Sequence, residues 1–119
     1  MKFLCIYKPA KAEGVGPTQQ EMAEMGKYIE DSMKAGVLLS TEGCLPSALG
    51  ARVRRSGGKF AVVDGPFSEA KEIVGGFALI QAPSKAAAIE IAKNFMNVAG
   101  DGETEVRQIY EPGMDFAKS

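Results

Sequence analysis

The chain has 119 residues, of which 45% are hydrophobic and 24% charged, so its length and composition are those of one soluble globular domain. Lys and Arg together number 14 against 15 Asp and Glu, and the net charge of −1 offers no basic surface for nucleic acid or an anionic membrane. The chain has no His, which excludes His-activated nucleophiles, imidazole bases and nearly all transition-metal sites. We therefore expect no metal or other cofactor, and no nucleic-acid or membrane partner.

The N-terminal segment predicts a cytoplasmic protein. Its apolar stretch, Phe3–Tyr7, is shorter than a signal peptide requires, and a membrane helix needs about 20 apolar residues. In that compartment the two cysteines, Cys5 and Cys44, are expected to be reduced thiols. Because Cys5 lies within an apolar run, we expect it to pack as a small buried hydrophobic residue.

The first third of the chain predicts a strand, a loop and a helix. Lys2–Tyr7 is nearly continuously apolar, as in a buried strand, and Pro9–Pro17 is a loop rich in Gly and Pro. Thr18 and Glu21 have the spacing of a capping box, in which each side chain bonds a backbone N–H of the other. Gly36 is placed to end the helix as its left-handed cap residue.

Within this helix, apolar side chains recur at helical spacing and form one stripe. Its members are Met22, Met25, Ile29 and Met33. A Met-rich stripe can be an adaptable binding surface, but packing into the core is its commoner use, and we expect the latter.

The middle of the chain predicts a strand at Val37–Thr41 followed by a hairpin. Ala51–Arg55 and Lys59–Val63 are its two arms, and Gly57 and Gly58 supply the positive φ of a tight turn. The hairpin also concentrates positive charge. Its cationic residues are Arg52, Arg54, Arg55 and Lys59, which indicate a solvated edge that resists strand addition, or else an anion site.

The last third predicts a strand at Ile73–Gln81, a helix from Ser84 to Gly100 and a strand at Thr104–Tyr110. We assign residues 1–111 to a single domain and 112–119 to a C-terminal tail. The order strand–helix–strand, hairpin, strand–helix–strand is typical of a ferredoxin-like α+β fold, an antiparallel sheet with two helices on one face.

This architecture leaves one face of the sheet without a helix. Lys2–Tyr7 and Ile73–Gln81 are apolar on both sides, so the uncovered face needs a partner. A second copy of the chain is the simplest partner, and we expect a two-fold homodimer formed through the sheet faces, with a pocket on each side of the paired sheets.

The segment 63–77 carries the most unusual residues, centred on Asp64, Gly65 and Pro66. One interpretation is a rigid corner, in which the Asp64 carboxylate accepts the N–H groups of the turn. The other is a pocket, in which Asp64 moves a proton to or from a small ligand. The candidate ligand-binding residues are Tyr7, Glu42, Asp64, Gly65, Pro66, Phe67, Lys71 and Glu72, with Asp64 as the candidate catalytic residue.

This segment closely resembles the signature of the DGPF-domain branch of the YCII-related family. The match is carried by the run from Val63 to Phe77, and Ala35–Leu38, Glu42–Pro46 and Glu105–Gln108 agree as well. The resemblance implies a dimeric α+β barrel. It also implies a small bacterial protein, in a family mostly of unknown function whose genes in some cases lie beside extracytoplasmic-function sigma factors and whose relatives include muconolactone dehalogenases.

The chain departs from that family in one respect. YCII-type proteins are thought to use a His–Asp pair with the His on the first helix, and this chain has no His. Two hypotheses remain. The first is a homodimeric module that binds a small molecule or serves as an accessory protein, for instance one associated with a sigma factor. The second is a cofactor-free enzyme that performs proton transfer or lyase chemistry on a small hydrophobic acid or lactone through Asp64.

Overall fold

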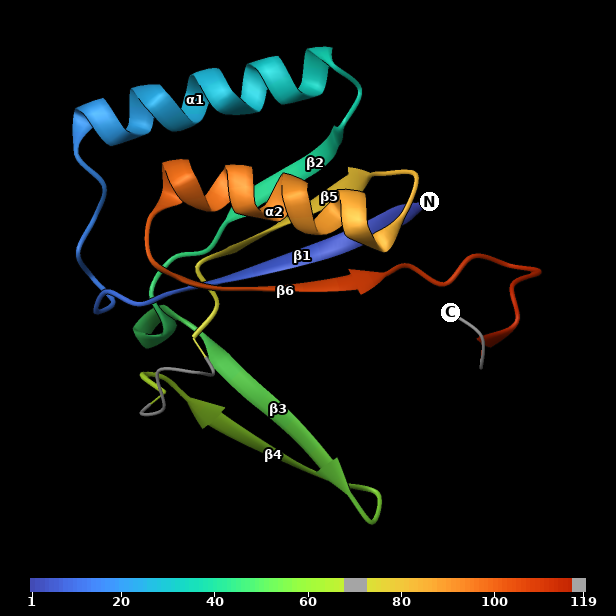
Figure 1. Ribbon diagram of the computed structural model, residues 1–119. Helices are drawn as coiled ribbons and strands as arrows, with labels where there is room; N and C mark the ends of the chain where they lie inside the picture. Colours follow the sequence, from blue (N-terminus) through green and yellow to red (C-terminus); the bar gives the residue numbers. More distant parts are fainter. Residues whose placement is uncertain (68–72, 117–119) are drawn as a thin grey trace.

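The computed structural model describes residues 1–67 and 73–116. Its elements, in chain order, are β1 (Lys2–Pro9), α1 (Gln19–Lys34), β2 (Leu38–Gly43), the 3-10 turn η1 (Ser47–Leu49), β3 (Ala51–Ser56), β4 (Lys59–Asp64), β5 (Gly76–Gln81), α2 (Lys85–Ala99) and β6 (Gly102–Gln108). Four strands form an antiparallel sheet in the order β2-β5-β1-β6, and both helices lie on one side of it (Figure 1). The predicted ferredoxin-like α+β fold is confirmed.

Local signals in the sequence determine where α1 begins and ends. The backbone N–H of Glu21 donates to the Thr18 hydroxyl at 3.1 Å, and the Thr18 N–H donates to the Glu21 carboxylate at 3.0 Å. This is the predicted capping box. After the helix, Gly36 takes a φ of 76°, which only glycine adopts without strain.

The strand ends differ from the prediction by a few residues. β6 stops at Gln108 rather than Tyr110, because Gln108 pairs with Phe3 and β1 has almost no chain left beyond it. β5 begins at Gly76 rather than Ile73. There Gly75 packs on the end of β1, where an added Cβ would lie 2.8 Å from the Pro9 ring.

The hydrophobic core lies between α2 and the sheet. Phe3 is 2% exposed and Ala88 fully buried, and the other buried residues are Cys5, Leu38, Ile80, Ala82 and Ala92. Helix α1 contributes no buried residue. The expectation that its apolar stripe packs into the core is confirmed only at Ile29, which is partly buried against this core, whereas Met22 is 59% exposed and Met33 46% exposed.

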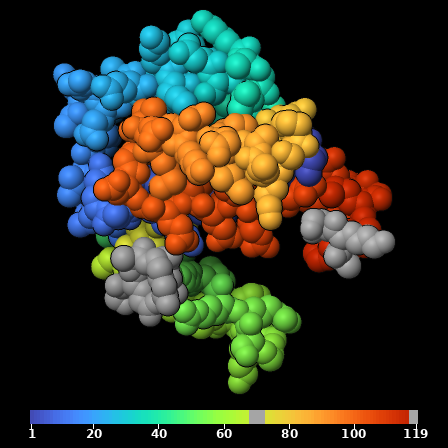
Figure 2. Space-filling model, in the orientation of Figure 1, coloured from blue at the N-terminus to red at the C-terminus, as the bar shows by residue number. Residues whose placement is uncertain are grey.

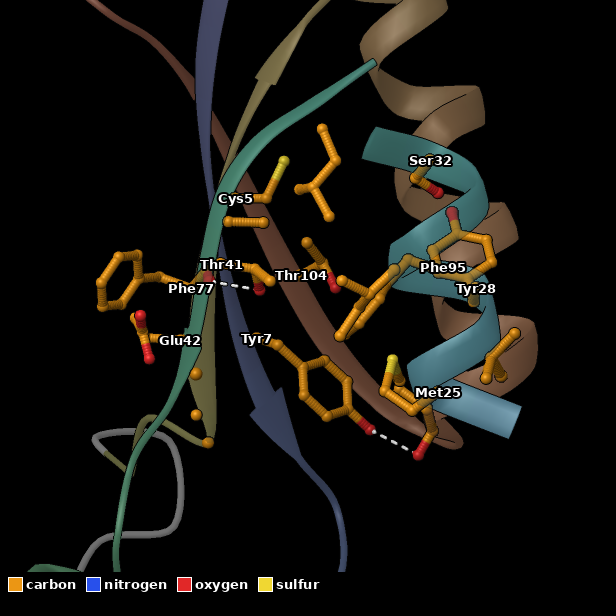
Figure 3. Close-up of a pocket in the computed structure, with 18 of the residues that line it drawn as sticks. Cys5, Tyr7, Met25, Tyr28, Ser32, Thr41, Glu42, Phe77, Phe95 and Thr104 are labelled. Atoms are coloured by element: carbon orange, nitrogen blue, oxygen red, sulfur yellow. Dashed lines mark hydrogen bonds between the residues drawn. The ribbon is translucent and has the colours of Figure 1, made fainter. Parts of the chain in front are cut away.

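No helix formed by the described residues lies over the second face of the sheet (Figure 1). Strand alternation places Leu4, Ile6, Phe77 and Leu79 on this side, and the register pairs Leu4 with Leu79 and Ile6 with Phe77. We call these four residues the open face. Figure 3 shows Phe77 on the opposite side of the sheet from Tyr7.

The β3–β4 hairpin forms a separate two-stranded sheet that projects from the main body (Figures 1 and 2). Val53 and Val62 face each other across it, and both are about two-thirds exposed, at 68% and 65%. Its turn residues Gly57 and Gly58 both have positive φ, as predicted. No helix in the described ranges is long and apolar enough to cross a membrane.

A candidate ligand cavity between the helices and the sheet

A cavity of about 590 Å³ lies between α1, α2 and the helix-covered face of the sheet (Figure 3). Ligand-binding cavities commonly have volumes of roughly 300–1,000 Å³. Strands β1, β2, β5 and β6 form its floor, and the loop before α1 contributes to its rim. The cavity exists because α1 touches the core through the partly buried Ile29 but contributes no buried residue, which leaves space between the helix and the sheet.

The α1 wall of the cavity explains the exposed Met stripe. Met22, Met25 and Ile29 all line the cavity, so the stripe forms a wall of an open space. Gly26 also lines it, in the middle of the helix, and an added Cβ at Gly26 would meet no atom within 4 Å. The alternative use of a Met-rich stripe, as an adaptable surface, matches this position better than core packing does.

An aromatic cluster joins the walls. The Phe95 ring from α2 packs edge-on against Tyr7 of β1, with ring centroids 5.3 Å apart. Phe95 also lies 6.4 Å from the ring of Tyr28 on α1. Leu38 and Ile80, both buried, line the cavity farther along the sheet from Tyr7. The lining is thus predominantly apolar from one end to the other.

Most of the hydroxyl groups on the cavity wall already have partners. The Tyr7 hydroxyl lies 3.0 Å from the carbonyl oxygens of both Gly100 and Asp101, where α2 ends, and donates to them. Burial, and to a lesser degree the charge of Asp101, raise the pKa of Tyr7. Thr41 donates to the carbonyl oxygen of Phe77 at 3.0 Å. These side chains tie the walls together.

Thr104 is different. Its Oγ1 is buried and has no hydrogen-bond partner, the one such side-chain atom found in residues 1–67 and 73–116. Thr104 lies on β6 directly opposite Tyr7 and projects into the cavity (Figure 3). An unpaired buried hydroxyl costs about 1–3 kcal/mol, so its presence requires an explanation.

Charged residues reach this cavity only at its rim. Among the described residues, the charged ones that line it are Lys11, Glu21 and Glu42, and all are exposed. The pKa of Glu21 is lowered, most by the hydrogen bond from the Thr18 backbone N–H and then by the Thr18 hydroxyl and the charge of Lys11. Glu42 projects from the opposite side of the sheet from Tyr7 (Figure 3). In the part of the chain that the structure describes, no cluster of Cys, Asp and Glu could hold a metal ion.

The Asp64 turn lies outside this cavity, and close packing of its backbone accounts for its glycine. The Gly65–Pro66 peptide bond is cis, and an added Cβ at Gly65 would overlap the Ser47 carbonyl oxygen. The Gly65 N–H donates to Gly50 O at 3.0 Å, and the Phe67 N–H donates to Ser47 Oγ at 3.1 Å. The N–H groups of this part of the turn therefore bond to the η1 region and not, as the corner interpretation expected, to the Asp64 carboxylate.

Glu13 completes this corner from the loop before α1. Its carboxylate accepts from the Ser47 backbone N–H at 2.7 Å and from the Ser47 hydroxyl at 2.5 Å. The Arg52 guanidinium lies 3.7 Å above the ring of Phe67. Glu13, Ser47 and Phe67 line a second, smaller hollow of about 290 Å³. The arrangement is typical of a structural junction that fixes the base of the hairpin.

The structure separates the predicted site residues into two groups. Tyr7 and Glu42 line the cavity, whereas Phe67 lines the smaller hollow. Asp64 is exposed, and the described turn residues Asp64, Gly65 and Pro66 line neither. Lys71 and Glu72 lie outside the described residues.

Sequence reasoning missed most of the cavity. The missed lining residues that matter most are Met25, Gly26, Tyr28, Phe95 and Thr104. A signal was present in the helix, where a glycine interrupts a Met-rich stripe at a position where Ala would be the better helix former. Nothing in the sequence marked Thr104, whose unpaired hydroxyl appears only in three dimensions.

Comparison with known proteins finds a family whose model matches nearly the whole chain. Residues 1–112 match the YCII-related domain. An uncharacterized protein of Rhizobium meliloti (strain 1021), R00369, is 38% identical over 90 residues, which cover 73% of this chain and 69% of that protein.

Proposed function

The chain belongs to the YCII-related family, and we propose that it is a homodimeric protein that binds a small apolar molecule between its helices and its sheet. The observation that carries the binding function is the cavity under α1, which has an apolar lining and a buried, unpaired Thr104 hydroxyl. A domain of this size gains stability by closing apolar surfaces on each other. A space left open among Met, Phe and Tyr side chains is one that a ligand can fill.

The lining favours binding over acid–base catalysis. General acid–base chemistry needs a titratable side chain within hydrogen-bond reach of the reacting atom. Of the two acidic lining residues, both exposed, Glu21 is occupied by its capping box and the Glu42 carboxylate points to the opposite side of the sheet (Figure 3). Burial raises the pKa of Cys5, so the thiol in this cavity is protonated and a poor nucleophile. Asp64, the candidate base, is not among the described lining residues.

A fluorescence titration with the uncharged probe N-phenyl-1-naphthylamine tests the binding function. We expect a saturable rise in emission with one site per chain, because the probe enters an apolar, water-poor space. Gly26→Leu should fill part of the cavity and weaken probe binding at least tenfold. Ala23→Leu is the matched control, since it adds the same side chain to an exposed position on the same helix that does not line the cavity.

Two results would contradict the binding function. One is emission that never saturates or that equals the signal of a chain unfolded in urea. The other is equal loss of binding in Gly26→Leu and Ala23→Leu, which would mean that the probe binds to the outer surface of α1 rather than beneath it.

The homodimer is supported by the open face. Leu4, Ile6, Phe77 and Leu79 form an apolar patch on the face of the sheet that neither α1 nor α2 covers, and Phe77 is 40% exposed. Antiparallel sheets usually present polar side chains to water on such a face. A second copy covers the patch by two-fold symmetry, as in most small homo-oligomers.

Light scattering over a range of concentrations tests the dimer. We expect the wild-type mass to be twice that of one chain at micromolar concentration. Ile6→Glu would place a carboxylate next to Glu105, its neighbour on β6, and should give monomers. Ala86→Glu puts the same charge on an exposed position of α2 and should remain dimeric. A wild-type monomer at these concentrations would refute the dimer.

A further inference from the structure

We infer that the cavity selects uncharged, elongated molecules whose single polar group, a hydroxyl or a carbonyl, hydrogen-bonds to Thr104. This inference rests on the proposed binding function and names its ligand class. It depends on three features: the positions of the charged residues around the cavity, the hydrogen bonds of its hydroxyl groups, and the length of the cavity along the sheet.

Charge excludes most metabolites from this cavity. A phosphate or carboxylate buried in a protein needs a cationic partner or several N–H donors, because transfer from water costs many kcal/mol otherwise. The one cationic residue among the described lining side chains is Lys11, which is exposed at the rim. A charged head group would therefore remain in water at the rim or would not bind.

In the described residues one buried hydroxyl, that of Thr104, is left without a partner, and it is the position we assign to a polar atom of the ligand; the hydroxyls of Tyr28 and Ser32, which also line the cavity, interact with each other. Tyr7 and Thr41 donate their protons to backbone carbonyl oxygens, whereas Thr104 Oγ1 has neither a donor nor an acceptor. A hydroxyl can donate to a ligand carbonyl or accept from a ligand hydroxyl. A ligand that makes this bond satisfies a buried group that the free protein leaves unpaired.

The register of the strands gives the length of the cavity along the sheet. Ile80 pairs with Phe3 and Gly76 pairs with Tyr7, and both Ile80 and Gly76 line the cavity. These positions are four residues apart on β5, which corresponds to about 13 Å along an antiparallel strand. Thr104 lies at the level of Tyr7, near the strand ends, so the apolar part of the ligand extends from there toward Leu38 and Ile80.

The experiment displaces N-phenyl-1-naphthylamine with three probes of equal chain length: 1-decanol, decanoate and decylammonium, at pH 8. We expect 1-decanol to displace the fluorophore, and the two ions to need at least tenfold higher concentrations. Decanoate or decylammonium that displaces as well as 1-decanol would overturn the inference. If the fluorophore itself does not bind, the proposed function fails; if it binds and the ions compete equally, only the ligand class fails.

Thr104→Val tests the role of the hydroxyl. The variant removes an unpaired buried group, so we expect a higher melting temperature for the free protein, together with about three- to tenfold weaker binding of 1-decanol. Ser84→Ala is the control. Ser84 does not line the cavity, and the variant loses the hydroxyl that accepts from the Ala87 N–H at the start of α2, so it should melt lower and bind 1-decanol as tightly as wild type. Unchanged affinity for 1-decanol in Thr104→Val would overturn the assignment. If the Thr104 hydroxyl instead had a structural role in the free protein, its loss would lower the melting temperature.

Discussion

Replacement of Gly26 by Ala tests the space under α1 through stability alone. Gly26 lies in the interior of α1, has no positive φ, and has room for a Cβ with no atom within 4 Å. The added methyl group should therefore only reduce the freedom of the unfolded chain, and should raise the free energy of unfolding by about 0.5–1 kcal/mol. In a chain of this size that corresponds to a rise in melting temperature of roughly 2–6 °C.

Gly36→Ala is the control, in which we expect the free energy of unfolding to change in the opposite direction. Gly36 also has no atom within 4 Å of a built Cβ, but its φ is 76°, so Ala there must adopt a left-handed conformation. We expect a loss of about 1–2 kcal/mol in the free energy of unfolding. Urea denaturation followed by circular dichroism measures both variants.

The outcome that refutes this reasoning is a destabilised Gly26→Ala. A loss of stability would mean that the Cβ meets the sheet or α2, so that α1 packs directly on its neighbours and the cavity is closed. Equal effects at Gly26 and Gly36 would show that the two backbone conformations do not differ as described.

Three further changes follow from the contacts of single side chains. Tyr7→Phe keeps the ring against Phe95 but removes the proton donated at the end of α2, and should lower the free energy of unfolding by about 0.5–1.5 kcal/mol in urea titrations; no change would mean that this hydroxyl is solvated. Phe3→Ala, at the most buried large side chain, should lower the free energy of unfolding by about 3–5 kcal/mol, and a loss below about 1 kcal/mol would mean that Phe3 is not a core residue. The pKa of Glu21 is lowered in the folded protein, so its contribution to stability is present above the unfolded pKa of about 4.3 and is lost as the pH falls through the lower folded pKa. Glu21→Gln, which keeps a capping amide, should make the melting temperature less dependent on pH below 4.5, and an unchanged acid profile would exclude this carboxylate as the cause.

The sequence predicted the elements well where local chemistry decides them. The Thr18–Glu21 box, Gly36 and the Gly57–Gly58 turn appear as expected, because each depends on neighbouring backbone atoms. The apolar runs in the sequence predicted the strands of the sheet. The strands that are apolar on both sides predicted that one face of this sheet has no helix over it. Strand ends were less certain, since they depend on how far the partner strand extends.

The candidate site was predicted less well for a physical reason. An apolar stripe has the same pattern whether it packs on a sheet or lines a space above it, and only the distance of α1 from the sheet decides between these. Met22 and Met25 therefore appeared as core residues although they line the cavity, whereas Ile29 does pack against the core. Conversely, the glycine of the Asp64 turn, Gly65, is needed because its backbone meets Ser47 closely, and such a contact between distant residues resembles a binding motif in sequence.

The measurement that most directly tests binding beneath α1 is the alkylation rate of Cys5. Cys5 lines the cavity and is buried with a raised pKa, whereas Cys44 is exposed. In a Cys44→Ser variant, we expect slow reaction of Cys5 with N-ethylmaleimide, slowed further as N-phenyl-1-naphthylamine saturates the protein. Cys44 in a Cys5→Ser variant should react at the same rate with and without the fluorophore. Protection of Cys5 alone is the predicted result, and a Cys5 rate unchanged at saturating fluorophore would contradict the account.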